Sequence, residues 1–576
     1  MLIEWDVPIE MDDGIVLRAD VFTPTTTDQY PVLLSYGPYG KGLAFQEAYP
    51  PQWEYMVEQY PEVAEGTSNR YQNWEVVDPE KWVPDGYVCV RVDSRGTGRS
   101  PGDINVWSRR EALDLYHCIE WAAAQPWSNG RVGLAGISYY AMNQYQAASL
   151  QPPHLAAICP WEGASDWYRE FSRHGGILCE FADNWYPRQV EKVQHGVGER
   201  GYTSAITGDL VAGPDTLEPD ELIARRADLG HDIKSRPLID QWHLERSPNW
   251  SAVKVPMLSA GNWGGHGLHL RGNIEAFVQA ASEQKWLEIH GGAHWVDFYT
   301  DRGVALQKEF FDHFLKGKDN GWDRRPPVHL RIRHADGTFA DRFEHQWPLA
   351  RTEWTRYHLT SDAGLSPHSC DPARVEYDTA GEGVTFTTAA FETTTEITGP
   401  LAAKLFISSE TNDADLFLIV RLFDTDNREV TFMGALDPNT PVAQGWLRAS
   451  HRALDPERSL PYRPYHPHEA AEPLVPRQVY ELDIEIWPTS IVIPPGYRLG
   501  LTVRSNDYRY DGELTDFAKS FHYANRGIGP FAHTDLDDRP TEIFDSQITL
   551  HLGGKTNSFL LVPVVPSEGA STSDNT

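Results

Sequence analysis

The sequence predicts two parts: an α/β domain that contains an inserted helical segment, followed by an all-β sandwich. Up to about residue 322, apolar strand-like runs alternate with segments of helical periodicity, which is typical of a mostly parallel sheet covered by helices. Residues 164–252 interrupt this pattern and are aromatic, polar and helix-prone. From Pro326 onward, short alternating segments are separated by Pro, Gly, Asn and Asp, as in a sandwich.

The α/β part is expected to open with strands at 15–22 and 31–37, joined as a hairpin by the polar turn between them. The run from Tyr87 to Asp93 has the pattern of a buried strand and ends in a glycine-rich segment. The remaining elements are expected as strands at 131–138, 154–163, 255–261 and 285–292 and helices at 111–125, 271–282 and 307–317.

These patterns set the expected domain boundaries. The α/β domain comprises residues 1–162 and 254–322, and the inserted helical segment comprises residues 163–253. The sandwich occupies residues 323–566. The polar tail at 567–576 is expected to be disordered, because it has too few apolar residues to pack.

Charge and cysteine usage narrow the classes of partner and location. The 50 Lys and Arg against 82 Asp and Glu give a formal net charge of −32, which repels nucleic acid and anionic membrane surfaces. The first residues do not have a signal-peptide pattern, and no uncharged stretch is apolar enough to span a bilayer. Five scattered cysteines without a CxxC pair favour a cytoplasmic location. A homo-oligomer is compatible with the sequence, which does not specify an oligomeric state.

Ser138 is the candidate nucleophile. It directly follows an apolar strand and precedes a helix-like run, which is the context of a nucleophile elbow, and Gly136 allows close approach of the backbone. Tyr140 stands where the G-x-S-x-G pattern has its last glycine, so an ordinary serine at a strand end is the alternative.

The segment around this serine, residues 119–148, resembles the elbow of serine hydrolases of the X-Pro dipeptidyl-peptidase and cocaine-esterase type (CocE/NonD). The resemblance extends over most of the chain, including residues 11–22, 93–102, 307–317, 397–422 and 445–452. It implies an α/β-hydrolase core, a helical cap, a C-terminal jelly roll and activity on esters or amides. In this family a bulky residue two positions after the serine is tolerated, which accommodates Tyr140.

His294 is the candidate base, because a serine hydroxyl needs a neighbouring base that an acid orients. It lies in a loop after a late strand, and the family carries its histidine in a matching loop. The alternatives are a structural role for His294 and the neighbouring His290, which is expected on the strand itself.

The acid is where the sequence departs from the family. The family places an aspartate in the loop after the strand at 255–261, where this chain has Gly264. Glu162, at the end of the preceding strand, is therefore the candidate acid and keeps the order serine, acid, histidine. A solvated loop or helix-capping role is the alternative for Glu162, and Asp166 is expected to be a helix cap or a structural acid.

The oxyanion is expected to be bound by the backbone N–H of Tyr139 and, as the resemblance implies, by the hydroxyl of Tyr39. Tyr36 is a rival for the second role, and aromatic packing is the alternative for either tyrosine. An apolar substrate pocket is expected to involve three tryptophans: Trp161, Trp263 and Trp295.

Four histidines near the late loops, His266, His269, His290 and His294, raise the question of a catalytic metal. Helical HExxH spacing and a set of carboxylate partners are absent, so no metal and no cofactor are expected. The glycine-rich segment 94–102 does not have the GK[ST] ending of a phosphate-binding loop.

These observations predict a cofactor-free serine hydrolase that cleaves a small-molecule ester or amide through an acyl-enzyme. An X-Pro dipeptidyl peptidase is the first alternative and would need a site for a free amino group. A non-catalytic ligand-binding relative with a decayed triad is the second, favoured by the missing aspartate at position 264.

Overall fold

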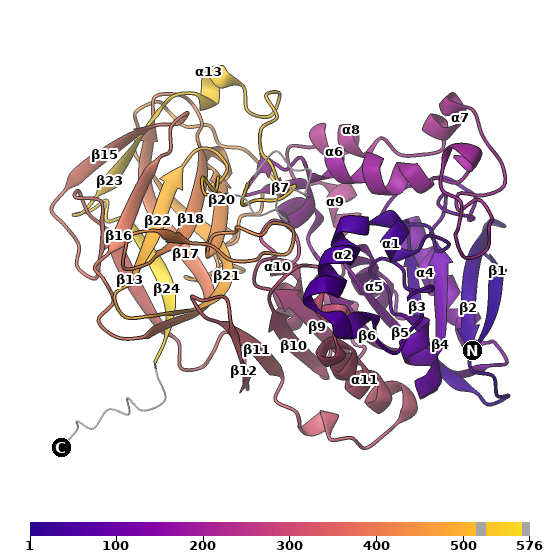
Figure 1. Cartoon of the computed structure of the whole chain (residues 1–576). Helices are drawn as coiled ribbons and strands as arrows, with labels where there is room; N and C mark the ends of the chain where they lie inside the picture. The colour runs from indigo at the N-terminus through magenta and orange to yellow at the C-terminus, as the bar shows by residue number, and fades with distance from the viewer. Residues whose placement is uncertain (514–525, 567–576) are drawn as a thin grey trace.

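The computed structural model describes residues 1–513 and 526–566, with an α/β half and an all-β half side by side (Figure 1). In the described part of the α/β half, ten strands form one sheet in the order β1-β2-β4-β3-β5-β6-β9-β10-β11-β12. Strands β4, β3, β5, β6, β9, β10 and β11 are parallel, whereas β1, β2 and β12 pair antiparallel at the two edges. The strand bounds are β1 Leu2–Glu10, β2 Val16–Thr23, β3 Tyr30–Gly37, β4 Val88–Asp93, β5 Ser128–Ile137, β6 Leu155–Trp161, β9 Met257–Asn262, β10 Lys285–His290, β11 Val328–Arg333 and β12 Phe339–Glu344.

Two predictions about this sheet are wrong. Strands β2 and β3 do not form a hairpin, because β4 lies between them and pairs with both. Strands β11 and β12 belong to this sheet and not to the sandwich that was expected to begin at residue 323. A period-two pattern marks a strand but does not specify its neighbour, so both errors concern pairing and not the presence of strands.

Helices cover both faces of the sheet, which explains why its central strands are apolar on both sides. On one face, side chains of α4 (Arg109–Ala123), α5 (Tyr139–Ser149) and α10 (Arg271–Gln279) pack with the strands in a single core. On the other face, α3 (Pro79–Trp82) and α11 (Asp301–Lys316) contribute Trp82, Phe310 and Phe311 to a second core.

The segment between β6 and β9 consists of short helices joined by loops, and its aromatic side chains join the second core. Trp167, Phe171 and Trp185 pack around Trp107 of the α/β domain. The segment also holds a short hairpin, β7 and β8, which the sequence pattern did not indicate. Its element bounds are η3 Trp167–Ser172, β7 Arg173–His174, β8 Ile177–Leu178, α6 Phe181–Trp185, η4 Tyr186–Val190, α7 Pro219–Ala224, α8 Leu229–Lys234 and α9 Gln241–Glu245.

The all-β half is a 12-stranded sheet within the described residues, built around a core of Leu, Ile and Val side chains. Strand β24 pairs with both β13 and β17, so the path of strands closes into a barrel. The strand bounds are β13 Glu353–Leu359, β14 Gly364–Ser366, β15 Ala373–Asp378, β16 Val384–Thr388, β17 Thr395–Ser409, β18 Asp415–Phe423, β19 Glu429–Val430, β20 Ala443–Arg448, β21 Tyr480–Ile493, β22 Arg498–Arg504, β23 Gln547–Leu552 and β24 Phe559–Val565.

Among the helices in the described ranges, none combines the length and apolar character that a membrane crossing requires. The tail at 567–576, which was expected to be disordered, lies outside the described residues.

Candidate active site

Ser138 occupies a sharp turn between the buried strand β5 and helix α5. Its backbone angles, φ 54° and ψ −111°, are those of a strained turn, and its side chain is partly exposed whereas its neighbours are buried. Ser138 Oγ lies 3.0 Å from Nε2 of His269. The turn therefore presents a serine hydroxyl at the carboxyl edge of a parallel sheet, beside an imidazole.

The packing around the turn explains why Tyr140 is compatible with it. A Cβ atom at Gly136, whose φ is 153°, would lie 2.4 Å from Cβ of Tyr140. A Cβ atom at Gly37 would lie 2.5 Å from the Tyr140 ring. The tyrosine thus fills space that two neighbouring glycines leave open, and the last glycine of the usual motif is not needed.

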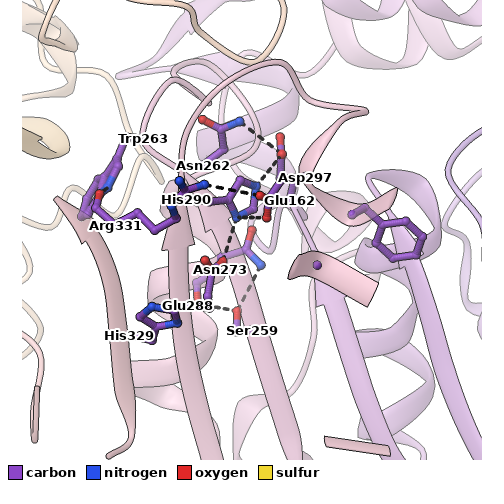
Figure 2. Close-up of polar contacts among 12 residues, drawn as sticks. Glu162, Ser259, Asn262, Trp263, Asn273, Glu288, His290, Asp297, His329 and Arg331 are labelled. Atoms are coloured by element: carbon purple, nitrogen blue, oxygen red, sulfur yellow. Dashed lines mark hydrogen bonds and ion pairs between the residues drawn. The ribbon is translucent and has the colours of Figure 1, made fainter. Parts of the chain in front are cut away.

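Glu162 lies in the first turn after β6 and is fully buried. Its Oε2 accepts a hydrogen bond from Nδ1 of His294 at 2.8 Å. Its Oε1 accepts from Nε2 of His290 at 2.8 Å and from Nδ2 of Asn262 at 3.2 Å (Figure 2). The structure therefore brings together the acid and the histidine that the sequence proposed, although they come from loops more than 130 residues apart.

The structure does not place His294 on Ser138, which is the contact that the sequence predicted. Nε2 of His294 lies 3.1 Å from Oε1 of Glu75, and the hydrogen bond of the Ser138 hydroxyl goes to His269 instead. The rings of His269 and His294 are close neighbours, with centroids 4.4 Å apart. His269 thus contacts the serine hydroxyl directly, and His294 lies beside His269 with its Nε2 turned to Glu75.

His269 and Glu75 were missed as members of this site. His269 was expected only as one of four histidines that raise the question of a metal, and Glu75 lies outside the predicted motifs. His269 Nδ1 is buried without a hydrogen-bond partner among the described residues, so no acid orients this ring. A signal that could have indicated His269 is its position five residues after Gly264, in the loop that carries the acid in the family.

The two histidines have opposite proton affinities. Burial lowers the pKa of His269 well below its ordinary value, and the neighbouring His294 lowers it further. Burial also lowers the pKa of His294, but the carboxylates of Glu162 and Glu75 outweigh burial and raise it to about 9. Burial raises the pKa of Glu75 despite its bond to His294. In this arrangement His269 is a neutral hydrogen-bond partner of Ser138, and His294 holds a proton between two acids.

His290, at the end of β10, holds Glu162 from the other side. Its Nε2 faces Glu162, and its Nδ1 lies 2.7 Å from Oε2 of Glu288 (Figure 2). Burial opposes its charge, but Glu288, Asp297 and Glu162 raise the pKa of His290 to about 10. Burial likewise opposes the charge of Glu162, whose pKa His294 and His290 lower to about 2. His290 is therefore a buried cation that keeps Glu162 ionised.

Of the two predicted oxyanion donors, one belongs to the elbow and the other to the loop after β3, and the rings of Tyr39 and Tyr139 have centroids 6.0 Å apart. The Tyr139 N–H is the first of helix α5, where backbone donors have no partner within the helix. The Tyr39 hydroxyl accepts a hydrogen bond from Nε1 of Trp185 at 3.1 Å, which leaves its own proton free to be donated. Burial raises the pKa of Tyr39, so the hydroxyl stays protonated. Tyr36, the rival, accepts from the Arg95 N–H at 3.3 Å and packs in the other core.

The three predicted pocket tryptophans are all buried, and they differ in position. Trp161 stacks on His290, with ring centroids 5.1 Å apart. The Trp295 indole donates to the Gln52 carbonyl at 3.0 Å. The Trp263 indole donates to the Arg331 carbonyl at 2.8 Å and packs in a core shared with the all-β half (Figure 2). The structure does not bring Trp263 to Ser138.

The glycine-rich segment after β4 has an internal structural role. Asp93 accepts hydrogen bonds from the backbone N–H groups of Lys41 and Arg99 at 2.6 and 2.8 Å. Backbone donors that would cradle a phosphate are thus used to fix the loop that carries Tyr39.

The order of the sheet and the elbow at the end of β5 place the protein in the class of α/β-hydrolase-like serine hydrolases. Family models agree: residues 13–296 match the X-Pro dipeptidyl-peptidase (S15 family), and residues 320–515 match the X-Pro dipeptidyl-peptidase C-terminal non-catalytic domain.

Similar proteins cover nearly the whole chain. A crystal structure of a CocE/NonD family hydrolase from Staphylococcus aureus is 31% identical, covers 98% of this chain and 94% of its own, and has a TM-score of 0.82. The cocaine esterase of Rhodococcus sp. is 24% identical over 97% of this chain and 98% of its own length. A putative Xaa-Pro dipeptidyl-peptidase of Streptomyces avermitilis is 24% identical over 74% of this chain and 68% of its own. The chain belongs to the CocE/NonD and X-Pro dipeptidyl-peptidase family of serine hydrolases, so the predicted family and the predicted hydrolase function are confirmed.

Proposed function

We propose that this hydrolase cleaves a small-molecule carboxylic ester or amide through an acyl-enzyme on Ser138. The observation that carries the proposal is the strained turn that presents the Ser138 hydroxyl between a histidine at 3.0 Å and the first N–H of α5. The hydroxyl oxygen attacks the carbonyl carbon, and its proton passes to an imidazole. The Tyr139 N–H and the Tyr39 hydroxyl donate to the oxyanion. The leaving alcohol or amine takes up the proton, and water then hydrolyses the acyl-enzyme.

We infer that His294 is the base of the productive complex and that Glu162 is its acid. Support comes from the 2.8 Å bond between Glu162 and His294 Nδ1, because a base needs an acid to fix its tautomer and to balance its charge. His269 has no such partner. To act as base, His294 must exchange its Nε2 contact with Glu75 for one with Ser138, displacing His269. Until then, His269 holds the serine hydroxyl in place.

The elements around the site support two further assignments. We propose that residues 163–253 act as a helical cap, since Trp185 of this segment contacts the hydroxyl of Tyr39 and the ring of Tyr139. We propose a jelly-roll arrangement for the all-β half, whose paired long strands enclose one apolar core.

Five free cysteines favour a cytoplasmic location, and the net charge of −32 argues against nucleic-acid and membrane partners.

The test is hydrolysis of 4-nitrophenyl esters together with labelling by a fluorophosphonate. Ser138→Ala is expected to abolish labelling and to lower kcat by several orders of magnitude, because only binding and oxyanion contacts remain. Ser149→Ala, at the far end of the same helix, is the matched control and should retain both. A folded wild-type protein that is not labelled would instead support a ligand-binding relative.

One observation favours a substrate with a free amino group, such as an X-Pro dipeptide amide. The buried Glu75 carboxylate lies next to His294, and its Oε2 accepts no hydrogen bond of ordinary length and angle among the described residues, although the Trp74 indole is near enough to lower the pKa of this carboxyl. An ammonium group is the natural partner of such an oxygen. On this alternative, acetylation of the substrate amine and Glu75→Gln should each raise KM for Xaa-Pro anilides. Neither result is expected if simple esters are the preferred substrates.

A further inference from the structure

A second cluster of metal-binding residue types lies away from Ser138, where the β7–β8 hairpin meets the loop that follows residue 525. It consists of His174 on β7, Cys179 just after β8, and His533. All three side chains are buried, and their candidate ligand atoms lie within 4.8 Å of one another. Nothing in the reaction at Ser138 uses these residues.

The hydrogen bonds of the cluster leave two lone pairs facing each other. His174 Nε2 lies 2.7 Å from the Gly267 carbonyl and 3.3 Å from the Glu170 carbonyl, so it must carry a proton. His533 Nδ1 lies 2.7 Å from a carboxylate oxygen of Asp507, so it carries a proton as well. In two neutral rings, the remaining atoms, His174 Nδ1 and His533 Nε2, are both acceptors. They lie 2.8 Å apart, and such a contact requires a cation between or on them.

The cation is either a proton on one ring or a metal ion, and Cys179 distinguishes the two. A proton shared between the rings has no use for a thiol. Two imidazoles and a thiolate are a ligand set that zinc prefers. We propose that His174, Cys179 and His533 bind a zinc ion.

The surroundings fit a zinc ion in charge and in hydrogen bonding. One thiolate and the Asp507 carboxylate balance the two positive charges of the metal. Asp507 accepts from both the ring Nδ1 and the backbone N–H of His533, the second at 2.8 Å. A carboxylate that holds the far nitrogen of a ligating histidine is the usual outer partner in zinc sites. Burial raises the pKa of the Cys179 thiol, so the thiolate would form only as the metal binds and the thiol proton leaves.

The position of the cluster indicates what the metal would do. It joins the hairpin of the segment 163–253 to the all-β half, and the ring of His174 holds the carbonyl of Gly267. Gly267 lies two residues before His269, the partner of Ser138. The zinc ion would thus fix a junction of three parts of the chain and would not take part in the chemistry at the serine. Two nitrogens bound to one tetrahedral zinc ion at about 2.0 to 2.1 Å lie about 3.3 Å from each other, so the two rings would have to move slightly apart from their present 2.8 Å.

The full-length protein is produced with added zinc and then dialysed. Its zinc content is measured by inductively coupled plasma mass spectrometry. We expect about one zinc per chain in the wild type and its loss in Cys179→Ser and His533→Gln. Cys370→Ser, which changes a cysteine outside the cluster, should retain the metal. Wild-type protein without zinc, or variants that keep it, would overturn the proposal.

Cobalt substitution gives a second readout that does not depend on the folding of a variant. Wild-type protein loaded with Co²⁺ should show thiolate-to-cobalt absorption in the near ultraviolet, and added Zn²⁺ should abolish it. Removal of zinc should lower the midpoint of thermal unfolding, and one equivalent of Zn²⁺ should restore it. Absence of the absorption and an unchanged midpoint would show that the two rings share only a proton.

Discussion

At the scale of single residues, the site concentrates backbone conformations that are costly for residues other than glycine. Ser138, Glu162 and Glu75 have φ angles of 54°, 48° and 64°. Each such conformation costs about 1 to 3 kcal/mol and persists only where the surrounding contacts enforce it. The carbonyl of Glu75 accepts the N–H of Ile137, and the N–H of Ser138 donates to Trp161. Hydrogen bonds between neighbouring segments thus hold Ser138, Glu162 and Glu75 in place together.

The pH dependence of kcat/KM should identify the base. If His294 accepts the proton of Ser138, it must first be neutral, and its pKa is raised to about 9. The value of kcat/KM should then rise about tenfold per pH unit up to a plateau above about pH 9. Because Glu75 contributes to this raised pKa, Glu75→Gln should shift the rise to lower pH. The measurement is initial-rate hydrolysis of a neutral ester between pH 5 and 10.

The competing base makes the opposite prediction. Burial lowers the pKa of His269 well below its ordinary value, so this imidazole is neutral at neutral and alkaline pH. A profile that is flat between pH 6 and 9, and an activity that His269→Gln abolishes, would assign the base to His269. If His294 is the base, His269→Gln should preserve the pH profile and change kcat less than His294→Gln does.

Glu162→Gln tests the acid. An amide neither balances an imidazolium nor fixes the tautomer of His294, so kcat should fall by about 10³- to 10⁴-fold. Circular dichroism should show whether the fold persists, because His290 and His294 lose a common partner. Glu275→Gln is the control: this carboxylate pairs with Arg463 on another part of the chain, and kcat should stay near normal. Near-normal turnover of Glu162→Gln would show that Glu162 is not the acid that orients His294.

At the scale of elements, the loop after β9 explains why the acid is not at position 264. A Cβ atom at Gly264 would lie 2.3 Å from Cα of Gly434 in the all-β half. The Gly264 carbonyl also accepts the N–H of Ala435 at 3.0 Å. Backbone packs directly on backbone here, so a side chain does not fit. The acid that we propose, Glu162, lies instead at the end of the neighbouring strand β6.

Gly264→Ala should therefore destabilise the junction of the two halves. An added methyl group against backbone that cannot move away costs about 1 to 3 kcal/mol, so the thermal unfolding midpoint should decrease. Gly42→Ala is the matched control, because its Cβ would meet ordinary contacts at 3.8 Å. Equal unfolding midpoints for both variants would mean that the backbone at Gly434 can move away from an added methyl group without loss of stability.

The sequence predicted the positions of strands and helices better than it predicted which strands pair. The strand ends near Ser138, Glu162 and His294 could be located from apolar runs. Parallel strands place these ends at one edge of the sheet, although β9 separates the strand before Glu162 from the strand before His294. The hydrogen bond between Ser138 and His269 could not be predicted, because it depends on side-chain rotation within a loop. Glu75 has no sequence pattern of its own, and its place in the site depends on how the chain folds between β3 and β4.

At the scale of the whole molecule, the all-β half takes part in building the active site. The carbonyl of Ala435 accepts the backbone N–H of His294 at 2.9 Å, so a loop of the second half helps to fix this candidate base. Arg271 of α10 bridges Glu170 and Glu485, both at 2.9 Å. The two halves therefore form one structural unit around the site, and changes at their junction should affect both.

Asp538 is the residue at this junction whose loss should be most costly. Its carboxylate pairs with Arg173 of β7 at 2.6 Å and with Arg448 of β20 at 2.9 Å, and all three side chains are buried. Removing one partner of a buried ion pair leaves an uncompensated charge, so Asp538→Asn should lower the free energy of unfolding by about 3 to 5 kcal/mol at pH 7. Urea denaturation followed by fluorescence measures this difference.

The same pair predicts how the loss depends on pH. Burial opposes the charge of Asp538, but Arg448 and Arg173 lower its pKa to about 2, below the ordinary aspartate value of about 3.9. A depressed pKa contributes stability above the unfolded value, and this stability disappears as pH falls through the folded value. The difference between wild type and Asp538→Asn should thus be full at pH 7 and shrink between about pH 4 and 2. Asp426→Asn, which removes an exposed ion pair, should cause little change at any pH. A constant difference over this range would mean that Asp538 acts through packing and not through its charge.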